Sequence, residues 1–213
     1  MSKNGYLLIE FMLIFFGLPI LIWVDKDFIH PAILLLPCLV FILLILKYRT
    51  EFKFIELKYL RISKKEWIKN SVIILLAAAL LLAGTVVFER ENLFNLIRAN
   101  PFIFIAIVVF YPIFSAYAQE IIFRTFLFWR YRTLFRNNFL FILASSASFS
   151  FMHIVYYNPV SMILTFAMGI YLAQVYLRTR SVLFTTILHG ILGILVFAFG
   201  LGQYFWLDMP LDK

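Results

Sequence analysis

Long apolar runs dominate this sequence and restrict the chain to folds whose main solvent is lipid. Seven such runs lie at 6–24, 31–46, 71–88, 101–118, 139–153, 159–177 and 182–200. A helix that spans a bilayer needs about 20 residues, and most of these runs reach that length once their flanks are included. Charged residues make up 14% of the chain, against about 25% in soluble domains. The sequence therefore predicts an all-α, polytopic bundle of about seven transmembrane helices.

The distribution of basic residues predicts the orientation of this bundle. With a cytoplasmic N-terminus, the inner segments hold 15 of the 19 Lys and Arg residues, counting Arg124, and the outer segments hold 4. This asymmetry follows the positive-inside rule. The densest group is a basic cytoplasmic loop at 47–70, where apolar residues mixed with lysines over 52–68 favour a helix lying on the inner leaflet. We therefore attribute the net charge of +8 to the membrane surface and expect no nucleic-acid partner.

The runs also predict how the chain is organised. We expect N-terminal transmembrane helices over 1–100, a functional core over 101–200 and a short tail at 201–213. The first run is too long for an ordinary signal peptide and no cleavage site follows it, so it is interpreted as a retained anchor. Cys38 lies in an apolar run and is expected to be a buried thiol.

Helix starts are marked by capping residues. Asn100 and Asn158 each precede a proline, and Ser181 precedes the last apolar run. Asparagine and serine cap helix N-termini, and proline is favoured at the first helical position. These three residues are predicted to be N-caps.

Ionisable side chains inside a bilayer are costly, so each one is a functional candidate. Glu10 lies close to the inner interface and His30 lies in a short outer loop, and we expect neither to belong to a site. The remaining candidates lie on three separate helices: Glu120 with Arg124, His153, and His189.

These residues fit several kinds of chemistry. Glu120 and Arg124 are four residues apart and can form an intrahelical ion pair. A carboxylate and two imidazoles can activate water by general base catalysis, and they can also hold a catalytic zinc ion. An intramembrane hydrolase, a metal site and a proton-coupled transporter are therefore alternatives, although we recognise no inverted repeats of the kind transporters have. By linear depth, Glu120 meets His153 only if its helix continues past run 101–118, or if the fifth helix starts below the inner interface.

Three short motifs resemble those of a known family. The stretch Gln119-Glu120-Ile121-Ile122-Phe123-Arg124 resembles the Glu-Glu-x-x-x-Arg signature of the CPBP family, the CAAX-protease and bacteriocin-processing group also called Abi. Phe149 to His153 matches its Phe-x-x-x-His motif, and His189 to Gly193 resembles its His-x-x-x-Asn motif. The resemblance covers about 101–200. It implies an intramembrane endopeptidase that cleaves membrane-associated proteins or peptides, and we expect it in a bacterial inner membrane.

The resemblance also implies residue roles. Glu120 would act as the base, His153 as its partner on the water, and His189 as an oxyanion stabiliser or second ligand, while Arg124 would hold Glu120 ionised. The family has been described both as metalloproteases and as metal-free glutamic proteases. We expect no cofactor. If zinc is bound, its expected ligands are Glu120, His153 and His189.

Two positions depart from the family motifs. Gln119 replaces the first glutamate and Gly193 replaces the asparagine. Glutamine cannot take up a proton at working pH, so Gln119 is expected to position water or substrate, together with Phe149 and Gly193. Gly193 supplies no side-chain donor, and with Gly190 it is suited to close helix packing. These departures leave a catalytically silent membrane scaffold or regulator as the alternative function.

Overall fold

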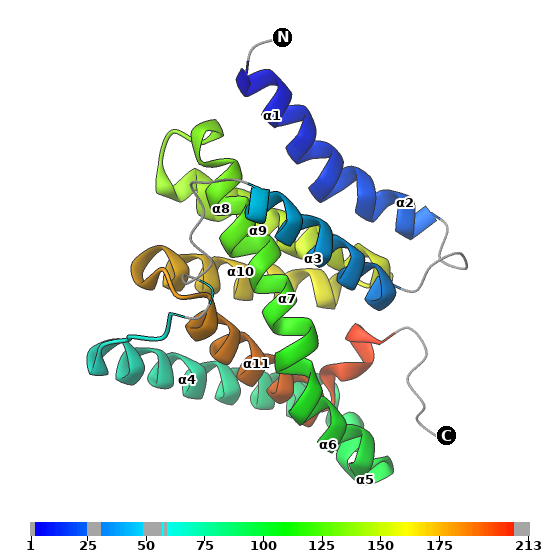
Figure 1. Cartoon of the computed structure of the whole chain (residues 1–213). Coiled ribbons are helices and arrows are strands. Elements are labelled where there is room, and N and C mark those ends of the chain that lie inside the picture. The colour runs from blue at the N-terminus through cyan, green and yellow to red at the C-terminus, as the bar shows by residue number, and fades with distance from the viewer. Residues whose placement is uncertain (1–2, 25–30, 49–56, 58, 207–213) are drawn as a thin grey trace.

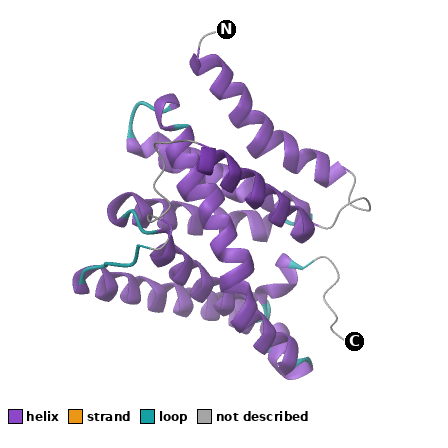
Figure 2. Cartoon of the chain, viewed as in Figure 1, coloured by secondary structure: helices purple, strands orange, loops and turns teal. Residues whose placement is uncertain are grey.

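The computed structural model describes residues 3–24, 31–48, 57 and 59–206, and the described elements are all helical (Figures 1 and 2). The first half contains α1 (Lys3–Met12), η1 (Leu13–Gly17), α2 (Leu18–Val24), α3 (Pro31–Tyr48), α4 (Lys64–Phe88), η3 (Arg90–Asn92) and α5 (Asn95–Ala99). The middle contains α6 (Pro101–Phe110), η4 (Tyr111–Ala116), α7 (Tyr117–Glu120), η5 (Ile121–Phe126), α8 (Leu127–Arg130) and η6 (Arg132–Leu134). The remainder contains α9 (Asn138–Met152), η7 (His153–Tyr156), α10 (Pro159–Thr179), α11 (Val182–Ala198) and η8 (Leu201–Phe205). The predicted all-α bundle is confirmed.

Each of the seven predicted runs lies in a helix. Five helices are long and apolar enough to cross a membrane: Asn4–Val24, Lys64–Phe88, Pro101–Arg130, Asn138–Tyr156 and Pro159–Thr179. Two shorter apolar helices, Leu35–Tyr48 and Val182–Ala198, complete the set. Large apolar side chains are exposed along these helices, as expected when lipid replaces water as the solvent. The chain is therefore an integral membrane protein.

The predicted helix starts are confirmed by their caps. The Asn100 and Asn158 carboxamide oxygens accept hydrogen bonds from the backbone N–H groups of Ile103 and Ser161. The Ser181 hydroxyl accepts one from the N–H of Phe184 in the same way. Each bond satisfies an N–H group that the first helical turn leaves without a partner.

The central helix is longer than the sequence predicts. The apolar run ends at residue 118, but the helix continues without a break to Arg130. Every residue from Glu120 to Phe128 is buried, so neighbouring helices surround this segment on all sides. Figure 1 shows it passing through the middle of the molecule, with α1 and α2 along one edge and α4 along the opposite edge. The continuation past Glu120 meets one of the two conditions for bringing Glu120 and His153 to a similar depth.

Two turns of this helix are π-helical. In η4 the N–H of Tyr117 bonds the carbonyl of Pro112, five residues earlier. Proline lacks an N–H and removes one ordinary helical hydrogen bond, so a widened turn at this point has a local cause. The second widened turn, η5, follows Glu120 directly. Such turns are frequent at functional sites.

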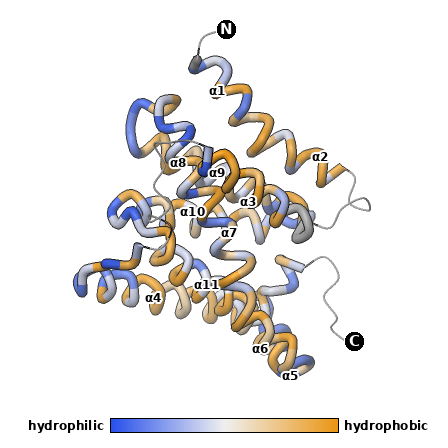
Figure 3. Tube along the Cα trace, in the orientation of Figure 1, coloured by the Kyte–Doolittle hydropathy of each residue, from blue (hydrophilic) through white to orange (hydrophobic). Residues whose placement is uncertain are grey.

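Polar groups gather at the helix ends. The hydrophilic ends of α4, α8 and α10 lie toward the same side, at the left of Figure 3. At this side Glu10 accepts hydrogen bonds from Arg130 at 2.9 and 2.7 Å and from Tyr131 at 2.8 Å, which ties α1 to the end of α8. The structure corrects the prediction for Arg124. The sequence places it among the basic residues of the cytoplasmic segments, but its side chain is buried in the bundle. The predicted asymmetry remains large without it.

Some predictions fall on residues outside this description. His30 lies outside it, as do residues 52–56 and 58 of the proposed surface helix 52–68 and the last seven residues of the tail. Within the described part of 52–68, residues 59–63 are not helical and α4 begins at Lys64. Cys38 is half-buried rather than fully buried.

Candidate active site

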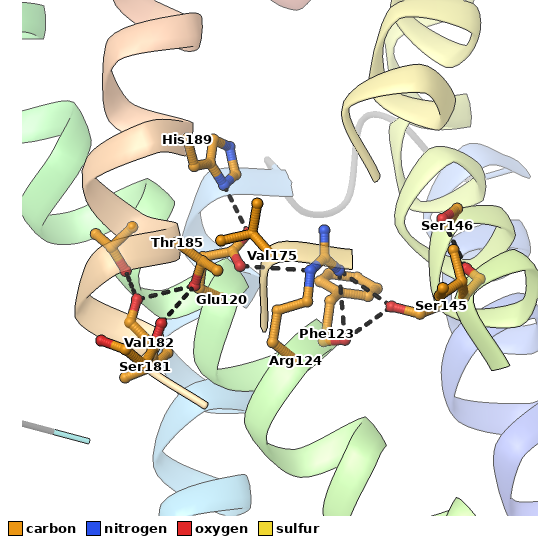
Figure 4. A network of polar contacts seen from close by, with 12 residues as sticks. Glu120, Phe123, Arg124, Ser145, Ser146, Val175, Ser181, Val182, Thr185 and His189 are labelled. Carbon is orange, nitrogen blue, oxygen red and sulfur yellow. Dashed lines mark hydrogen bonds and ion pairs between the residues drawn. The ribbon is translucent and has the colours of Figure 1, made fainter. Parts of the chain in front are cut away.

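The predicted glutamate lies at the centre of a buried polar network (Figure 4). Glu120 ends α7, and its Oε1 lies 2.9 Å from Nδ1 of His189 on α11. Its Oε2 lies 3.4 Å from Nε of Arg124, one turn further along the same helix. Glu120 and Arg124 are fully buried and His189 is 1% exposed. Because a carboxylate accepts hydrogen bonds, Nδ1 of His189 carries the proton in this contact.

The guanidinium of Arg124 is fixed by further contacts. Its Nη1 donates to the Ser145 hydroxyl at 3.1 Å and to the Phe123 carbonyl at 3.3 Å. The guanidinium also lies 5.2 Å from the centre of the Phe149 ring, within the range of a cation–π contact. These contacts stabilise the buried guanidinium, although its Nε and Nη2 have no hydrogen-bond partner among the described residues.

His153 is not part of this network. It stands where α9 gives way to η7, and its Nδ1 lies 2.8 Å from the carbonyl oxygen of Phe149. A carbonyl only accepts, so Nδ1 carries the proton and Nε2 has the free lone pair of neutral imidazole. The Phe149 ring packs edge-on against both imidazoles, with centroid distances of 5.0 Å to His153 and 5.5 Å to His189.

Two apolar cavities meet at His153. They have volumes of about 620 and 590 Å³, the size of small-molecule sites. The first lies among α4, α10, α11 and η8, and the second lies between the N-terminal helices and the central helix. Both are lined by the same polar side chains, which we call the shared wall: Tyr111, Ser115, Gln119, His153 and Tyr156. Glu120, Arg124 and His189 line neither cavity.

Gln119 presents an unsatisfied acceptor at this wall. Its Nε2 donates to the Ser115 hydroxyl at 2.8 Å, one helical turn earlier. Its Oε1 is buried and has no hydrogen-bond partner among the described residues. A buried acceptor without a partner is unfavourable, so a bound water or substrate N–H at this oxygen would stabilise the site. The expectation that Gln119 positions water or substrate is compatible with this placement.

The sequence did not single out Tyr111 or Ser115. Both lie on the helix of Gln119, at eight and four residues before it, and this spacing places all three on one face. That periodicity is the sequence signal that could have identified them. The sequence marked Gly190 and Gly193 as packing positions, and both adjoin this helix. A Cβ atom added at Gly193 would meet Tyr111, and one added at Gly190 would meet Pro112.

The residues proposed as zinc ligands do not fit a metal site. Among the described residues, no three His, Cys, Asp or Glu side chains form a group that could hold a metal. One Glu120 oxygen already binds His189 and the other faces the Arg124 cation, while His153 binds a backbone carbonyl. The structure thus joins Glu120, Arg124 and His189 and places His153 with Gln119 instead.

Comparison with known proteins gives one match. Residues 100–195 match the family model described as Rce1-like, type II CAAX prenyl endopeptidase. No curated protein and no solved structure matches the chain. The match confirms the resemblance to the CPBP group and supports a protease-type enzyme. It covers all three motifs, from Gln119 to Gly193.

Proposed function

We propose that this chain, whose residues 100–195 match the Rce1-like family model, is an intramembrane endopeptidase that acts at the shared wall of the two cavities. The observation that carries the proposal is the meeting of His153 and Gln119 at this wall. His153 offers a ring nitrogen with a free lone pair, and Gln119 offers an amide oxygen without a hydrogen-bond partner.

In this proposal His153 is the general base. Its Nδ1 is held by the Phe149 carbonyl, so Nε2 takes a proton from a water molecule whose other hydrogen bonds to Oε1 of Gln119. The water oxygen adds to the carbonyl carbon of the substrate peptide. The tetrahedral intermediate then collapses, the C–N bond breaks, and His153 returns the proton to the departing nitrogen.

Glu120, predicted as the base, has a positioning role in this scheme. Its Oε1 binds His189, its Oε2 faces the Arg124 cation at 3.4 Å, and it is fully buried and lines neither cavity. Its negative charge fixes the ring of His189, and both imidazoles pack against Phe149. The network therefore sets the position of His153 through Phe149. Catalysis does not require a proton to leave Glu120.

The cavities also support a class of substrate. Apart from the shared wall, the first cavity is lined almost entirely by apolar side chains, and the second is as well. A peptide bond placed at the wall would therefore have apolar groups on both sides. The family description names CAAX prenyl endopeptidases. For this chain we propose the broader class of membrane-associated proteins or peptides with apolar residues or lipid groups next to the cleaved bond.

The test compares protein termini in membranes from cells that express the wild type, His153→Ala or Tyr117→Phe. We expect new N- and C-termini with the wild type and their absence with His153→Ala, because loss of a general base typically costs about 10²–10⁴ in rate. Tyr117→Phe is the matched control. Its side chain is on the central helix, bonds a loop carbonyl and lines neither cavity, so it should keep the products.

Identical termini in all three membranes and in membranes from cells without the protein, with equal amounts of the three folded proteins, would exclude proteolysis. One observation favours a second candidate function, a catalytically silent membrane scaffold. The described residues that line the two cavities include no aspartate or glutamate. A scaffold would use the cavities to hold an apolar segment of a partner protein. The same membrane proteins should then copurify with the wild type and with His153→Ala.

A further inference from the structure

Tyr111 lies at the same wall as the proposed base. It begins the widened turn η4, and it lines both cavities together with Gln119 and His153. Its ring also packs edge-on against His189 at a centroid distance of 6.0 Å. Tyr111 therefore adjoins both the cavities and the buried polar network. None of the three motifs includes it.

The position of the Tyr111 ring depends on Gly193. A Cβ atom added at residue 193 would lie 2.6 Å from Cζ and 2.6 Å from the hydroxyl oxygen of Tyr111, and closer still to Cε1. Non-bonded heavy atoms in packed interiors stay well beyond these separations. The phenol thus fills the space that a side chain at 193 would occupy. Glycine at this position allows the ring to approach α11.

The Tyr111 hydroxyl is available to a ligand. Within the part of the chain that the structure describes, no group is found to accept a hydrogen bond from it, although half-buried phenols usually have a partner. A phenol retains its proton at neutral pH, so the group is a donor. A donor at an apolar cavity wall gains most from an acceptor that carries negative charge.

We propose that the Tyr111 hydroxyl stabilises the oxyanion of the reaction, in place of any side chain from position 193. This inference rests on the proposed function. As water adds to the peptide carbonyl, the carbonyl electron pair moves onto oxygen, and Tyr111 donates a hydrogen bond to that oxygen without losing its proton. The bond strengthens as charge develops, so it lowers the barrier rather than tightening substrate binding.

The test measures kcat and KM of the purified full chain with a peptide that spans a cleavage site found in the termini experiment. Tyr111→Phe keeps the ring and removes the donor, so we expect kcat to fall about 10²–10³-fold, as for other oxyanion donors, with KM changed less than about threefold. Tyr117→Phe removes a hydroxyl from the same helix outside the cavities and should leave both constants unchanged.

A swap of side chains tests the same point independently. Tyr111→Ala empties the space above Gly193, and adding Gly193→Asn supplies an amide donor from the opposite helix. The double variant should be more active than Tyr111→Ala alone, whereas a ring needed only for packing predicts no such rescue. If Tyr111→Phe keeps wild-type kcat while His153→Ala is inactive, the Tyr111 role is overturned and the protease stands. If the wild type cleaves nothing, both proposals are overturned.

Discussion

A side chain can act on the reacting water only if it reaches the cavity that holds the water. Two adjacent residues of one helix can differ in whether they reach it. Gln119 and Glu120 are adjacent in the chain, yet only Gln119 lines the cavities. Successive helical residues point about 100° apart. The sequence could predict the Glu120–Arg124 pair because its spacing is local. It could not predict which of the two adjacent residues faces the water, because the rotation of the helix depends on its packing.

Replacing the side-chain amide of Gln119 by a carboxylate should increase the rate of peptide cleavage. In Gln119→Glu the Ser115 hydroxyl can donate to one oxygen of the new carboxylate, and the other oxygen becomes a charged acceptor at the wall that His153 also lines. We expect kcat to rise about 10²-fold, since a positioned general base contributes at least that much in typical enzymes. The measurement is the initial cleavage rate of the peptide identified from the membrane termini.

The matched control is Gln174→Glu. This residue is exposed on α10 and lines neither cavity, so the same change of charge should leave the rate unaltered. An unchanged or reduced rate in Gln119→Glu, with the protein folded, would show that the wall does not need a base at this position.

At the scale of elements, the contact between α9 and α10 depends on a single glycine. These helices form the most extensive pair in the bundle. A Cβ atom added at Gly169 would lie 3.0 Å from Cα and 3.1 Å from Cβ of Ser146 on the facing helix. Small residues let membrane helices approach closely where lipid gives no hydrophobic driving force. Since α9 leads into His153, this contact also supports the position of the proposed base.

A larger side chain at this contact should separate the helices. We expect Gly169→Leu to destabilise the folded protein by about 1–3 kcal/mol, the usual cost of overpacking. Thermal unfolding of the purified protein in detergent measures the effect. Gly84→Leu is the control, because nothing lies within 4 Å of a Cβ atom added there, and its melting temperature should match the wild type. Equal melting temperatures for both variants would contradict this account of the helix pair.

At the scale of the whole molecule, the sequence predicted the helices and could not predict the cavities. Apolar runs mark transmembrane segments reliably because lipid imposes the same requirement on each of them. The shared wall instead combines Tyr111 and His153 from separate helices, and the first cavity is completed by Phe205 and Trp206 near the C-terminal end. Contacts between such distant segments have no local signature. The cytoplasmic orientation of the N-terminus remains a prediction from the basic residues.

The C-terminal segment that lines this cavity is held by a carboxylate. Glu89, directly after α4, accepts hydrogen bonds from the hydroxyl of Tyr204 and, at 3.3 Å, from the amide of Gln203. The Tyr204 hydrogen bond is the main cause that lowers the pKa of Glu89 below its ordinary value of 4.5. A lowered carboxyl pKa stabilises the folded state above pH 4.5, and this stabilisation is lost as pH falls through the folded-state pKa.

We therefore expect η8 to loosen in acid. Hydrogen exchange of residues 201–206, corrected for the intrinsic effect of pH, should become less protected between neutral pH and about pH 3, while that of α9 should stay constant. Glu89→Gln replaces the charged acceptor by a weaker neutral one and has no carboxyl to titrate, so its protection should be lower than that of the wild type at neutral pH and nearly independent of pH. If the wild type and Glu89→Gln give the same pH profile, Glu89 does not hold this segment.

The two widened turns of the central helix have a consequence for how such a chain can diverge. A π-turn closes its hydrogen bond over five residues, one more than an α-turn, so each acts as an inserted residue within the helix. Losing one residue from η4 would restore ordinary winding and leave the later side chains facing as before, whereas losing one from an α-helical turn would rotate them by about 100° against α11 and part Glu120 from His189. Substitutions at exposed positions such as Ile113, which lines neither cavity, change only a contact with lipid. In evolution this helix should therefore accept a change of length at its widened turns more readily than at its α-helical turns.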